Sequence, residues 1–416
     1  MADSQKKLST EAYKGVRDFY PEEQAVQNFM FDTLKRFVEK VGYVEYGASI
    51  LEPAELYRSK GAENAEMVNE QTYTFTDRGD REVTLRPEMT PTVARMVAAR
   101  RRDLGFPLRL YSIPNVFRYE RPQKGRLREH WQLNVDIFGT KSSYADAEIL
   151  GVAYGIMRTF GAKESDFVIK VGSRSYLDAF AKERGLTDEQ YKTLRRLLDA
   201  KDKMTAQEFE AGLSELEIEP GMLSADNPPA DIEQMLKEFA AANINNIVYD
   251  PSIVRGFDYY TGMVFEVFNT NPENRRALFG GGRYDNLTAL FDDEPCPGVG
   301  FGMGDVTLRD FLASRNLIPA YVPPTHVYIA ITSPELAGKA QTFAGDLREA
   351  GVNVAIDFGD RKLADQIRMA SKHKIRHLIV LGEDEITSGN IKIKDMESGD
   401  ESLLSKADVA AFLLKA

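Results

Sequence analysis

The chain has 416 residues, of which 43% are hydrophobic and 28% charged, so it can bury large cores, and its length indicates about two or three domains. A single cysteine, Cys296, excludes an internal disulfide framework and a zinc site built from several thiolates, and a formal net charge of −11 argues against a nucleic-acid binder that works through bulk positive charge. The first residues, MADSQKKLST, lack the apolar region of a signal peptide, and no apolar run reaches the roughly 18 residues of a membrane span, so a soluble cytoplasmic protein is expected.

The first predicted elements are a long helix and a strand. Pro21 suits the first turn of a helix, and acidic residues follow it. Gly42 ends the helix, and the segment YVEYGASILEP predicts one strand that finishes near Pro53. This pair fits either core packing or a subunit interface. The apolar positions that recur at the spacing of one helix face are Phe29, Met30, Leu34, Phe37 and Val38.

A predicted hairpin follows in TYTFTDRGDREVTLRPEMTPTVARMV, with its turn at Arg78 to Asp80 between two alternating strands. The second strand delivers Glu88 and Thr90 to its end, and Pro91 opens the next helix. Charged and hydroxyl groups at such a junction are typical of ligand sites. A helix cap formed by Thr90, with an incidental Glu88, is the competing interpretation.

The segment FRYERPQKGRLREHWQLNVDIFG, residues 117–139, predicts two strands joined by a loop at Pro122 to Gly125. Gln132, Asn134 and Asp136 alternate on the second strand and share one face. Guanidinium groups suit phosphate and carboxylate, so this polar face beside basic residues indicates a site for a phosphate-bearing ligand. A solvated hairpin with surface ion pairs is the alternative. The basic residues are Arg118, Arg121, Lys124, Arg126 and Arg128.

Residues 173–242 change to charged, helix-forming sequence interrupted by Pro220 and by the run NPP, and they predict a small helical insertion. β-sequence returns in NNIVYDPSIVRGFDYYTGMVFEVF. The three successive glycines of FGGGRYD allow either a tight bend or close approach of a ligand, and they do not form a phosphate loop or a dinucleotide fingerprint. Gly300, Gly302 and Gly304 are interpreted as allowing close helix-to-strand packing.

After the proline-containing linker YVPPT, apolar strands and helices alternate to the end of the chain, which predicts a compact α/β domain. THVYIAIT, VNVAID and HLIVLG are expected as strands with helices between them, and NIKIKDM is followed by a final helix. This segment has no evident catalytic cluster, which suits a binding module.

Several motifs resemble one enzyme family in the same order along the chain. FRYERPQKGRLREHWQLNVDIFG resembles the second signature motif of class II aminoacyl-tRNA synthetases in its histidyl-tRNA synthetase version, and IVRGFDYYTGMVFEV resembles the histidine-specific motif. GVRDFYP, TLRPEMT and FGGGRYD fit the same family, and LADQIRMASKHKIRHLIVLGEDEITSGNIKIKDMESG resembles its anticodon-binding domain. The resemblance covers essentially the whole chain after about residue 12.

The resemblance implies an α/β (α+β) fold: a class II catalytic domain with an antiparallel sheet and helices, a helical insertion, and a C-terminal α/β anticodon-binding domain. The implied boundaries are 1–172 and 243–320 for the two catalytic halves, 173–242 for the insertion and 325–416 for the anticodon-binding domain. Members of the family form two-fold dimers, so residues 21–53 are expected at a homodimer interface.

The implied reaction is two-step ligation: histidine attacks the α-phosphate of ATP, accompanied by Mg²⁺, and the acyl group then passes to the 3′ end of tRNA(His). Arg118 matches the α-phosphate-binding arginine, and Arg255 matches a second catalytic arginine. Glu120 and Arg126 are expected to contact ATP. Gln123, together with Arg126, lies on the loop that approaches the tRNA acceptor end. No protein ligand for a metal is assigned.

The same resemblance implies a histidine pocket. Glu88 and Gln132 match positions that hold the ammonium and carboxyl groups of the amino acid. Asp136 and Tyr260 match positions that read the imidazole, whose two nitrogens a carboxylate and a phenol can pair with. The further residues expected to bind histidine are Thr90, Tyr259 and Gly282.

One position departs from the family pattern. The third class II motif ordinarily supplies an arginine to the ATP γ-phosphate, and Thr307 stands where that arginine is expected. Arg309 lies two residues further on and would point to a different helix face. The departure leaves a second interpretation open, a histidine-sensing regulatory subunit of ATP phosphoribosyltransferase, which does not aminoacylate tRNA. A class II synthetase for proline or threonine is a third, against which the GFDYYTG stretch argues.

Overall fold

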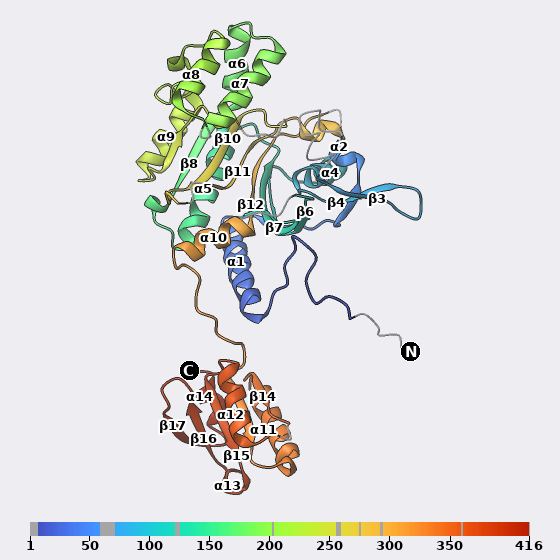
Figure 1. Ribbon diagram of the computed structural model, residues 1–416, viewed down its shortest axis with the longest axis vertical. Helices are drawn as coiled ribbons and strands as arrows, with labels where there is room; N and C mark the ends of the chain where they lie inside the picture. Colours follow the sequence, from blue (N-terminus) through green and yellow to red (C-terminus); the bar gives the residue numbers. More distant parts are fainter. Residues whose placement is uncertain are drawn as a thin grey trace. The chain divides into compact units, whose positions relative to one another are not determined.

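The computed structural model describes residues 7–58, 71–120, 125–201, 204–254, 259–273, 276–291, 294–358 and 361–415. The chain divides into two compact units, Met1–Pro319 and Ala320–Ala416, which are coloured from blue to orange and from orange to red in Figure 1. Each unit has its own sheet and its own apolar core.

A mostly antiparallel sheet forms the centre of the first unit, and nine of the described strands belong to it. All neighbours are antiparallel except the two outermost pairs, β1 with β5 and β8 with β9. In spatial order the strands are β1 (Val44–Glu45), β5 (Leu108–Ser112), β7 (Glu129–Phe138), β12 (Gly298–Gly304), β11 (Ala277–Arg283), β10 (Met263–Asn269), β8 (Phe167–Ser173) and β9 (Ile247–Tyr249), and β6 (Asn115–Phe117) pairs with β7.

One face of this sheet is covered by α1 (Pro21–Lys40), α5 (Ser143–Thr159) and α10 (Asp305–Ser314). The predicted helix after Pro21 is confirmed, and its apolar stripe supplies Met30, Leu34 and Val38 to the main core. Strand β7 contributes Leu133, Val135 and Ile137 to that core, because side chains alternate along a strand. The intervening polar side chains of β7 therefore face the opposite side, toward α4 (Thr90–Arg100).

The predicted single strand from residue 43 to Pro53 is wrong, because the structure has two short strands that belong to different sheets. β1 pairs with β5 in the main sheet, whereas β2 (Leu51–Pro53) pairs with β4 (Glu82–Leu85) in a small sheet that also contains β3 (Tyr73–Thr76). The Arg86 guanidinium occupies the break and donates to the carbonyls of Ala48 and Ser49 at 2.9 and 3.3 Å. These carbonyls thus find a side-chain partner in place of a strand neighbour.

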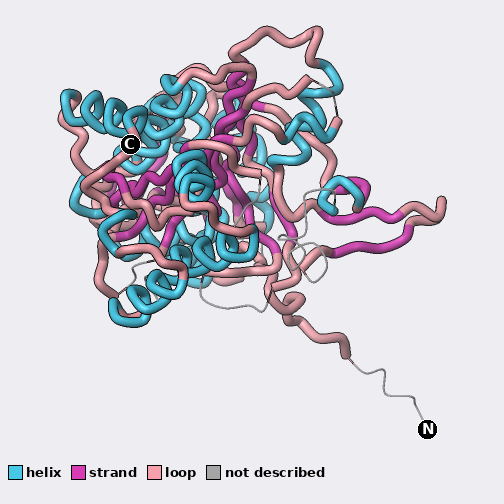
Figure 2. Tube along the Cα trace, turned by 90° about the horizontal axis from the view of Figure 1, so that it is seen from above, coloured by secondary structure: helices cyan, strands magenta, loops and turns pink. Residues whose placement is uncertain are grey.

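The predicted hairpin between β3 and β4 is confirmed, and Asp80 in its turn has φ of 58°. Figures 1 and 2 both show this hairpin extending away from the main sheet. Short α2 (Glu55–Arg58) precedes it, and α4 follows it with Pro91 in its first turn. For residues 117–139, the predicted strand pairing is present, with Phe117 opposite Glu129, but the first strand, β6, ends at Phe117. The predicted loop at Pro122 to Gly125 lies outside the described residues except for Gly125.

Helices dominate the region between β8 and β9, at one end of the first unit (Figure 1). Thr187 and Thr205 begin two of these helices, each with a reciprocal hydrogen-bonding cap that satisfies the first free amides. A separate small core built around Leu177, Leu194 and Leu213 holds the first three of these helices together. The last helix adds Ile232 and Met235 to the main core instead. The elements are α6 (Arg174–Glu183), α7 (Asp188–Ala200), α8 (Ala206–Glu215), η4 (Pro220–Leu223) and α9 (Ala230–Ala241).

The second unit is a five-stranded sheet with helices packed against it. Its outer strand β17 (Glu401–Ser405) was not predicted, because the sequence ESLLS does not alternate polar and apolar residues and none of its side chains is buried. The strand is defined by its pairing with β16 (Asn390–Asp395). Within the described ranges, no helix combines the length and apolarity needed to cross a bilayer. The remaining elements are β13 (Val327–Ile331), α11 (Ala337–Glu349), β14 (Val354–Ile356), α12 (Leu363–Lys372), β15 (His377–Leu381), α13 (Glu383–Ser388) and α14 (Val409–Leu413).

Candidate active site

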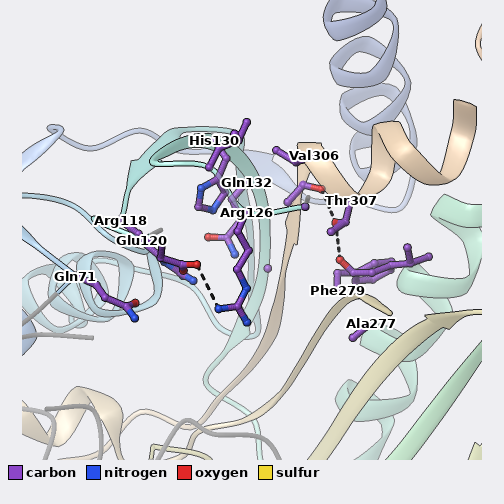
Figure 3. Close-up of a pocket in the computed structure, with 15 residues that line it drawn as sticks. Gln71, Arg118, Glu120, Arg126, His130, Gln132, Ala277, Phe279, Val306 and Thr307 are labelled. Carbon is purple, nitrogen blue, oxygen red and sulfur yellow. Dashed lines mark hydrogen bonds and ion pairs between the residues drawn. The ribbon is translucent and has the colours of Figure 1, made fainter. Parts of the chain in front are cut away.

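Two adjoining cavities lie over the polar face formed by β7, β12 and β11. The larger has a volume of about 410 Å³ and the smaller about 130 Å³. Arg118, Gln132 and Gly302 line both, so these three residues form their common wall. Figure 3 shows the larger cavity, with Arg118 and Glu120 on one side and Thr307 and Phe279 on the other.

The floor of the site depends on glycines in β12 that lie beside polar side chains of β7. Gly300 pairs with Asp136, and Gly302 pairs with Asn134. A Cβ atom at Gly302 would come within 3.0 Å of Gln132 Nε2, and one at Gly300 would come within 3.0 Å of Asp136 Oδ1. The interpretation of these glycines as helix-to-strand packing positions is therefore wrong for Gly300 and Gly302, whose missing side chains make room for the polar row of β7.

The smaller cavity is lined by Glu88, Thr90, Tyr259 and Tyr260, four of the residues expected to bind histidine. Glu88 is buried at the junction of β4 and α4, and the Tyr259 hydroxyl donates to its Oε2 at 3.3 Å. Burial raises the pKa of Tyr259 well above the ordinary value, so this phenol stays protonated near neutral pH. The pocket thus presents a carboxylate, held by a phenol, to any cationic group that enters.

Asp136 is only 2% exposed, and Tyr284 stands between it and the smaller cavity. Its Oδ1 accepts a hydrogen bond from the Tyr284 hydroxyl, while its Oδ2 has no hydrogen-bond partner among the described residues. Burial raises the pKa of Asp136 to about 7, against the opposing effect of the Tyr284 hydrogen bond. Tyr284 was missed from the sequence, although it belongs to the quoted FGGGRYD segment.

Gly282 also lies behind the pocket wall, and the described lining of the smaller cavity does not include it. A Cβ atom at this position would come 2.6 Å from Met263 O and 2.9 Å from the Tyr260 ring. The missing side chain of Gly282 therefore leaves room for the Tyr260 ring, which makes this glycine a support of the pocket.

The larger cavity carries Arg118 and Arg126 of the basic residues that the sequence predicted around it, whereas Arg128 is not in its described lining, and Arg121 and Lys124 lie outside the described residues. Arg118 lines it, and its Nε donates to the Pro87 carbonyl at 2.9 Å, which orients the guanidinium at the common wall. Glu120 and Arg126 form an ion pair at 3.3 Å across the cavity, visible in Figure 3. His130, which the sequence analysis did not single out, also lines it. Burial, with Arg118 and Arg17 nearby, lowers the pKa of His130 to about 3, so this imidazole is neutral at physiological pH.

The first turn of α10 closes the other end of the larger cavity, with Val306 and Thr307 in the lining. The preceding residue, Asp305, accepts from Arg17 at 2.6 Å and from the Trp131 amide at 3.0 Å. These contacts fix the amino end of α10 against β7. The amino end of a helix carries partial positive charge, so it favours an anion in the cavity.

Two of the expected site residues, Arg255 and Gln123, fall outside the described residues, and their roles stay predictions. Over the described ranges, no group of three or more His, Cys, Asp or Glu side chains is placed to hold a metal ion. The site therefore consists of a polar, cation-lined cavity large enough for a nucleotide and, across a common wall, a small cavity with buried carboxyl and phenol groups.

Comparisons with known proteins agree with this arrangement. The family model described as histidyl-tRNA synthetase matches residues 15–306, and the one described as anticodon binding domain matches residues 326–416. A histidine–tRNA ligase of Leptospira biflexa is 42% identical over 96% of this chain and 96% of its own length. One of Thermoplasma volcanium is 35% identical over 98% of this chain and 99% of its own.

Solved structures share the fold. A histidyl-tRNA synthetase from Nostoc sp. PCC 7120 superposes with a TM-score of 0.80 at 24% identity, covering 98% of this chain and 100% of the other. The apo histidyl-tRNA synthetase from S. aureus gives a TM-score of 0.76 at 23% identity, and the match covers 97% of this chain and 100% of the other. From the family match over more than half its length and from relatives of this identity, we conclude that the chain belongs to the histidyl-tRNA synthetase family.

Proposed function

We propose that the protein is a histidine–tRNA ligase, which activates histidine with ATP to histidyl-adenylate, with release of pyrophosphate, and then transfers the histidyl group to the 3′ end of tRNA(His). The observation that carries this proposal is the pair of adjoining cavities with Arg118 and Gln132 in their common wall. An amino acid in the smaller cavity would place its carboxylate at that wall, next to the α-phosphate of a nucleotide in the larger one. Holding two reactants in this way accounts for a large part of catalysis in such reactions.

In the smaller cavity, Glu88 would bind the ammonium group of histidine and Gln132 its carboxyl group. Both line the cavity, and the side-chain NH2 group of Gln132 is the donor that a carboxylate requires. Tyr260 and Tyr284 would contact the imidazole, with Asp136 behind Tyr284 setting the direction of its hydroxyl. Thr90, Tyr259 and Gly282 would complete and support the pocket.

In the larger cavity, Arg118 would hold the α-phosphate of ATP. Arg255 would contact the same phosphate from the opposite side. Glu120 and Arg126 would contact the nucleotide, and Mg²⁺ would enter as part of the ATP complex. Positively charged side chains at the reacting phosphate stabilise the negative charge that develops there in the transition state. Gln123 and Arg126 are assigned to the loop that meets the tRNA acceptor end.

We assign residues 1–172 and 243–320 to catalysis, 173–242 to a helical insertion, and 325–416 to recognition of the anticodon. The match of residues 326–416 to the anticodon binding domain family supports the last assignment. We further propose that the enzyme is a homodimer and works in the cytoplasm, where its tRNA substrate is used.

The test is histidine-dependent exchange of pyrophosphate into ATP by the purified protein, followed by charging of tRNA(His). We expect exchange with histidine and none with proline or threonine. Arg118→Ala is the control for contaminating activity, and it should reduce exchange by at least about 100-fold because the α-phosphate loses its cation.

Tight histidine binding without any exchange would contradict the proposal. It would favour a histidine-sensing regulatory subunit, and a structure described as an ATP phosphoribosyltransferase regulatory subunit/histidyl-tRNA synthetase from Bacillus halodurans shares the fold, with a TM-score of 0.70 at 22% identity.

A further inference from the structure

Thr307 occupies the end of the larger cavity without bringing a charge to it. Its hydroxyl donates to the Leu278 carbonyl at 2.7 Å and lies 3.2 Å from the Gly304 carbonyl, so it joins α10 to β11. Arg309 does not belong to the described lining of this cavity, as expected for a residue on another face of α10. The position that would carry an arginine at this end therefore carries a neutral side chain tied to the backbone.

The charged groups within the described lining lie elsewhere in the cavity. Arg118 stands at the common wall, and Arg126 is paired with Glu120 at 3.3 Å. His130 is neutral, because burial and the neighbouring arginines depress its pKa. Figure 3 shows Arg118 and Glu120 across the cavity from Thr307. A nucleoside triphosphate whose α-phosphate contacts Arg118 extends its β- and γ-phosphates away from that arginine. These negatively charged groups need cations of their own.

Arg276 brings a guanidinium to the Thr307 end. The point where a Cβ atom of Gly125 would lie is 3.5 Å from Arg276 Nη1 and 3.9 Å from Thr307 Cγ2. Gly125, Thr307 and Ala277 all line the larger cavity, and Ala277 directly follows Arg276 at the start of β11. Arg276 itself is outside the described lining, and its exposed side chain brings the guanidinium over the rim by rotation about its side-chain bonds.

We propose that Arg276 binds the β- and γ-phosphates of ATP and so supplies the positive charge that position 307 lacks. This inference rests on the proposed ligase function. In the activation step, a carboxylate oxygen of histidine bonds to the α-phosphorus while the bond from that phosphorus to the bridging oxygen breaks. The electron pair and the charge leave with pyrophosphate. Arg276 holds this leaving group, so it contacts ATP and pyrophosphate and makes no contact with histidyl-adenylate.

The test compares wild type with Arg276→Ala in exchange kinetics and in calorimetric titrations with ATP. We expect the KM for ATP, the KM for pyrophosphate and the Kd for ATP each to rise about tenfold, the usual effect of losing a charge-assisted hydrogen bond. The KM for histidine and the affinity for a non-hydrolysable sulfamoyl analogue of histidyl-adenylate should stay unchanged, since neither ligand has β- or γ-phosphates.

Two further variants sharpen the result. Arg309→Ala removes the same charge from a different face of α10 and should leave all these constants unchanged. Thr307→Arg in the Arg276→Ala background restores an arginine at the same end of the cavity and should recover most of the ATP affinity.

The assignment of Arg276 would be overturned if wild type and Arg276→Ala had equal KM values for ATP and pyrophosphate and equal Kd values for ATP. It would also be overturned if Arg276→Ala lost as much affinity for the adenylate analogue as for ATP, because that result would indicate a structural role. Absence of exchange in wild type that still binds ATP would instead overturn the ligase function alone.

Discussion

Asp136 is a buried carboxyl group whose hydrogen bond with Tyr284 lies at the wall of the smaller cavity. When its carboxyl is ionised, the Tyr284 hydroxyl donates to Oδ1 and turns its oxygen lone pairs toward the cavity, where they can accept an imidazole N–H. When the carboxyl is protonated, it can donate to Tyr284, whose own hydrogen is then free to point into the cavity. Because burial raises the pKa of Asp136 to about 7, this exchange of roles falls in the physiological range.

Histidine binding should therefore depend on the ionisation of Asp136. The raised pKa means that the acceptor form is lost as the pH falls below about 7, so we expect the KM for histidine to rise by up to about tenfold per pH unit below that value. Ionisation of the substrate imidazole, near 6.5, contributes separately. Exchange kinetics between about pH 5.5 and 8.5 measure both effects.

Asp136→Asn and Tyr284→Phe are the variants that separate these effects. In each variant, the pH dependence of the KM for histidine should reflect only the ionisation of the substrate imidazole. The KM for ATP should stay unchanged. A wild-type profile identical to those of both variants would show that Asp136 does not titrate in the binding step.

At the scale of elements, the site exists because β12 is poor in side chains where β7 is rich in polar ones. Three glycines of β12 alternate along the strand opposite Gln132, Asn134 and Asp136. The opposite face of β7 packs Leu133, Val135 and Ile137 into the main core, where fully buried aliphatic side chains each contribute about 1.5–3 kcal/mol. The core fixes the strand, and the fixed strand holds its polar row still over the glycine floor.

Gly302→Ala should damage binding while the protein still folds. The added methyl would overlap the end of the Gln132 side chain, which is flexible enough to turn away but then loses its place in the common wall. We expect the Kd for histidine, measured by calorimetry, to rise about tenfold, with only a small loss of thermal stability.

Gly304→Ala is the matched control on the same strand. A Cβ atom there comes no closer than 3.9 Å to His130 or Thr307, so histidine affinity should be retained. Equal affinities for the two variants would mean that the position of Gln132 does not matter for binding.

At the scale of the whole molecule, the first unit leaves apolar residues exposed on edge strands of both of its sheets. Val44 on edge strand β1 is 65% exposed, and Leu51 on β2 is 43% exposed. Edge strands with exposed apolar side chains favour pairing with another chain. Both residues lie in the segment 21–53 that the sequence analysis expected at a homodimer interface.

We predict that the protein is a dimer in sedimentation equilibrium experiments and that Val44→Glu weakens the association by at least about tenfold, because a charge would be buried at the interface. Val248→Glu is the control, since Val248 is also exposed on an edge strand, β9, at the opposite end of the sheet. A wild-type monomer at working concentration, or equal weakening by the two variants, would contradict this interface.

The sequence by itself determined the features that depend on neighbouring residues. The apolar spacing after Pro21 predicted α1, the turn at Asp80 predicted the β3–β4 hairpin, and the alternation of Gln132, Asn134 and Asp136 predicted one polar strand face. Periodicity and turn chemistry act over a few residues, so they can be read without knowing the fold. Motif resemblance added the family, which the comparisons confirmed.

Only the tertiary structure decided which distant residues meet. It paired Gly300 with Asp136, placed Tyr284 between Asp136 and the cavity, and brought Arg276 close to Gly125 and Thr307. It also divided the segment from residue 43 to Pro53 between two sheets. These outcomes depend on strand register and on contacts between residues far apart in the chain, and local sequence patterns carry no information about either.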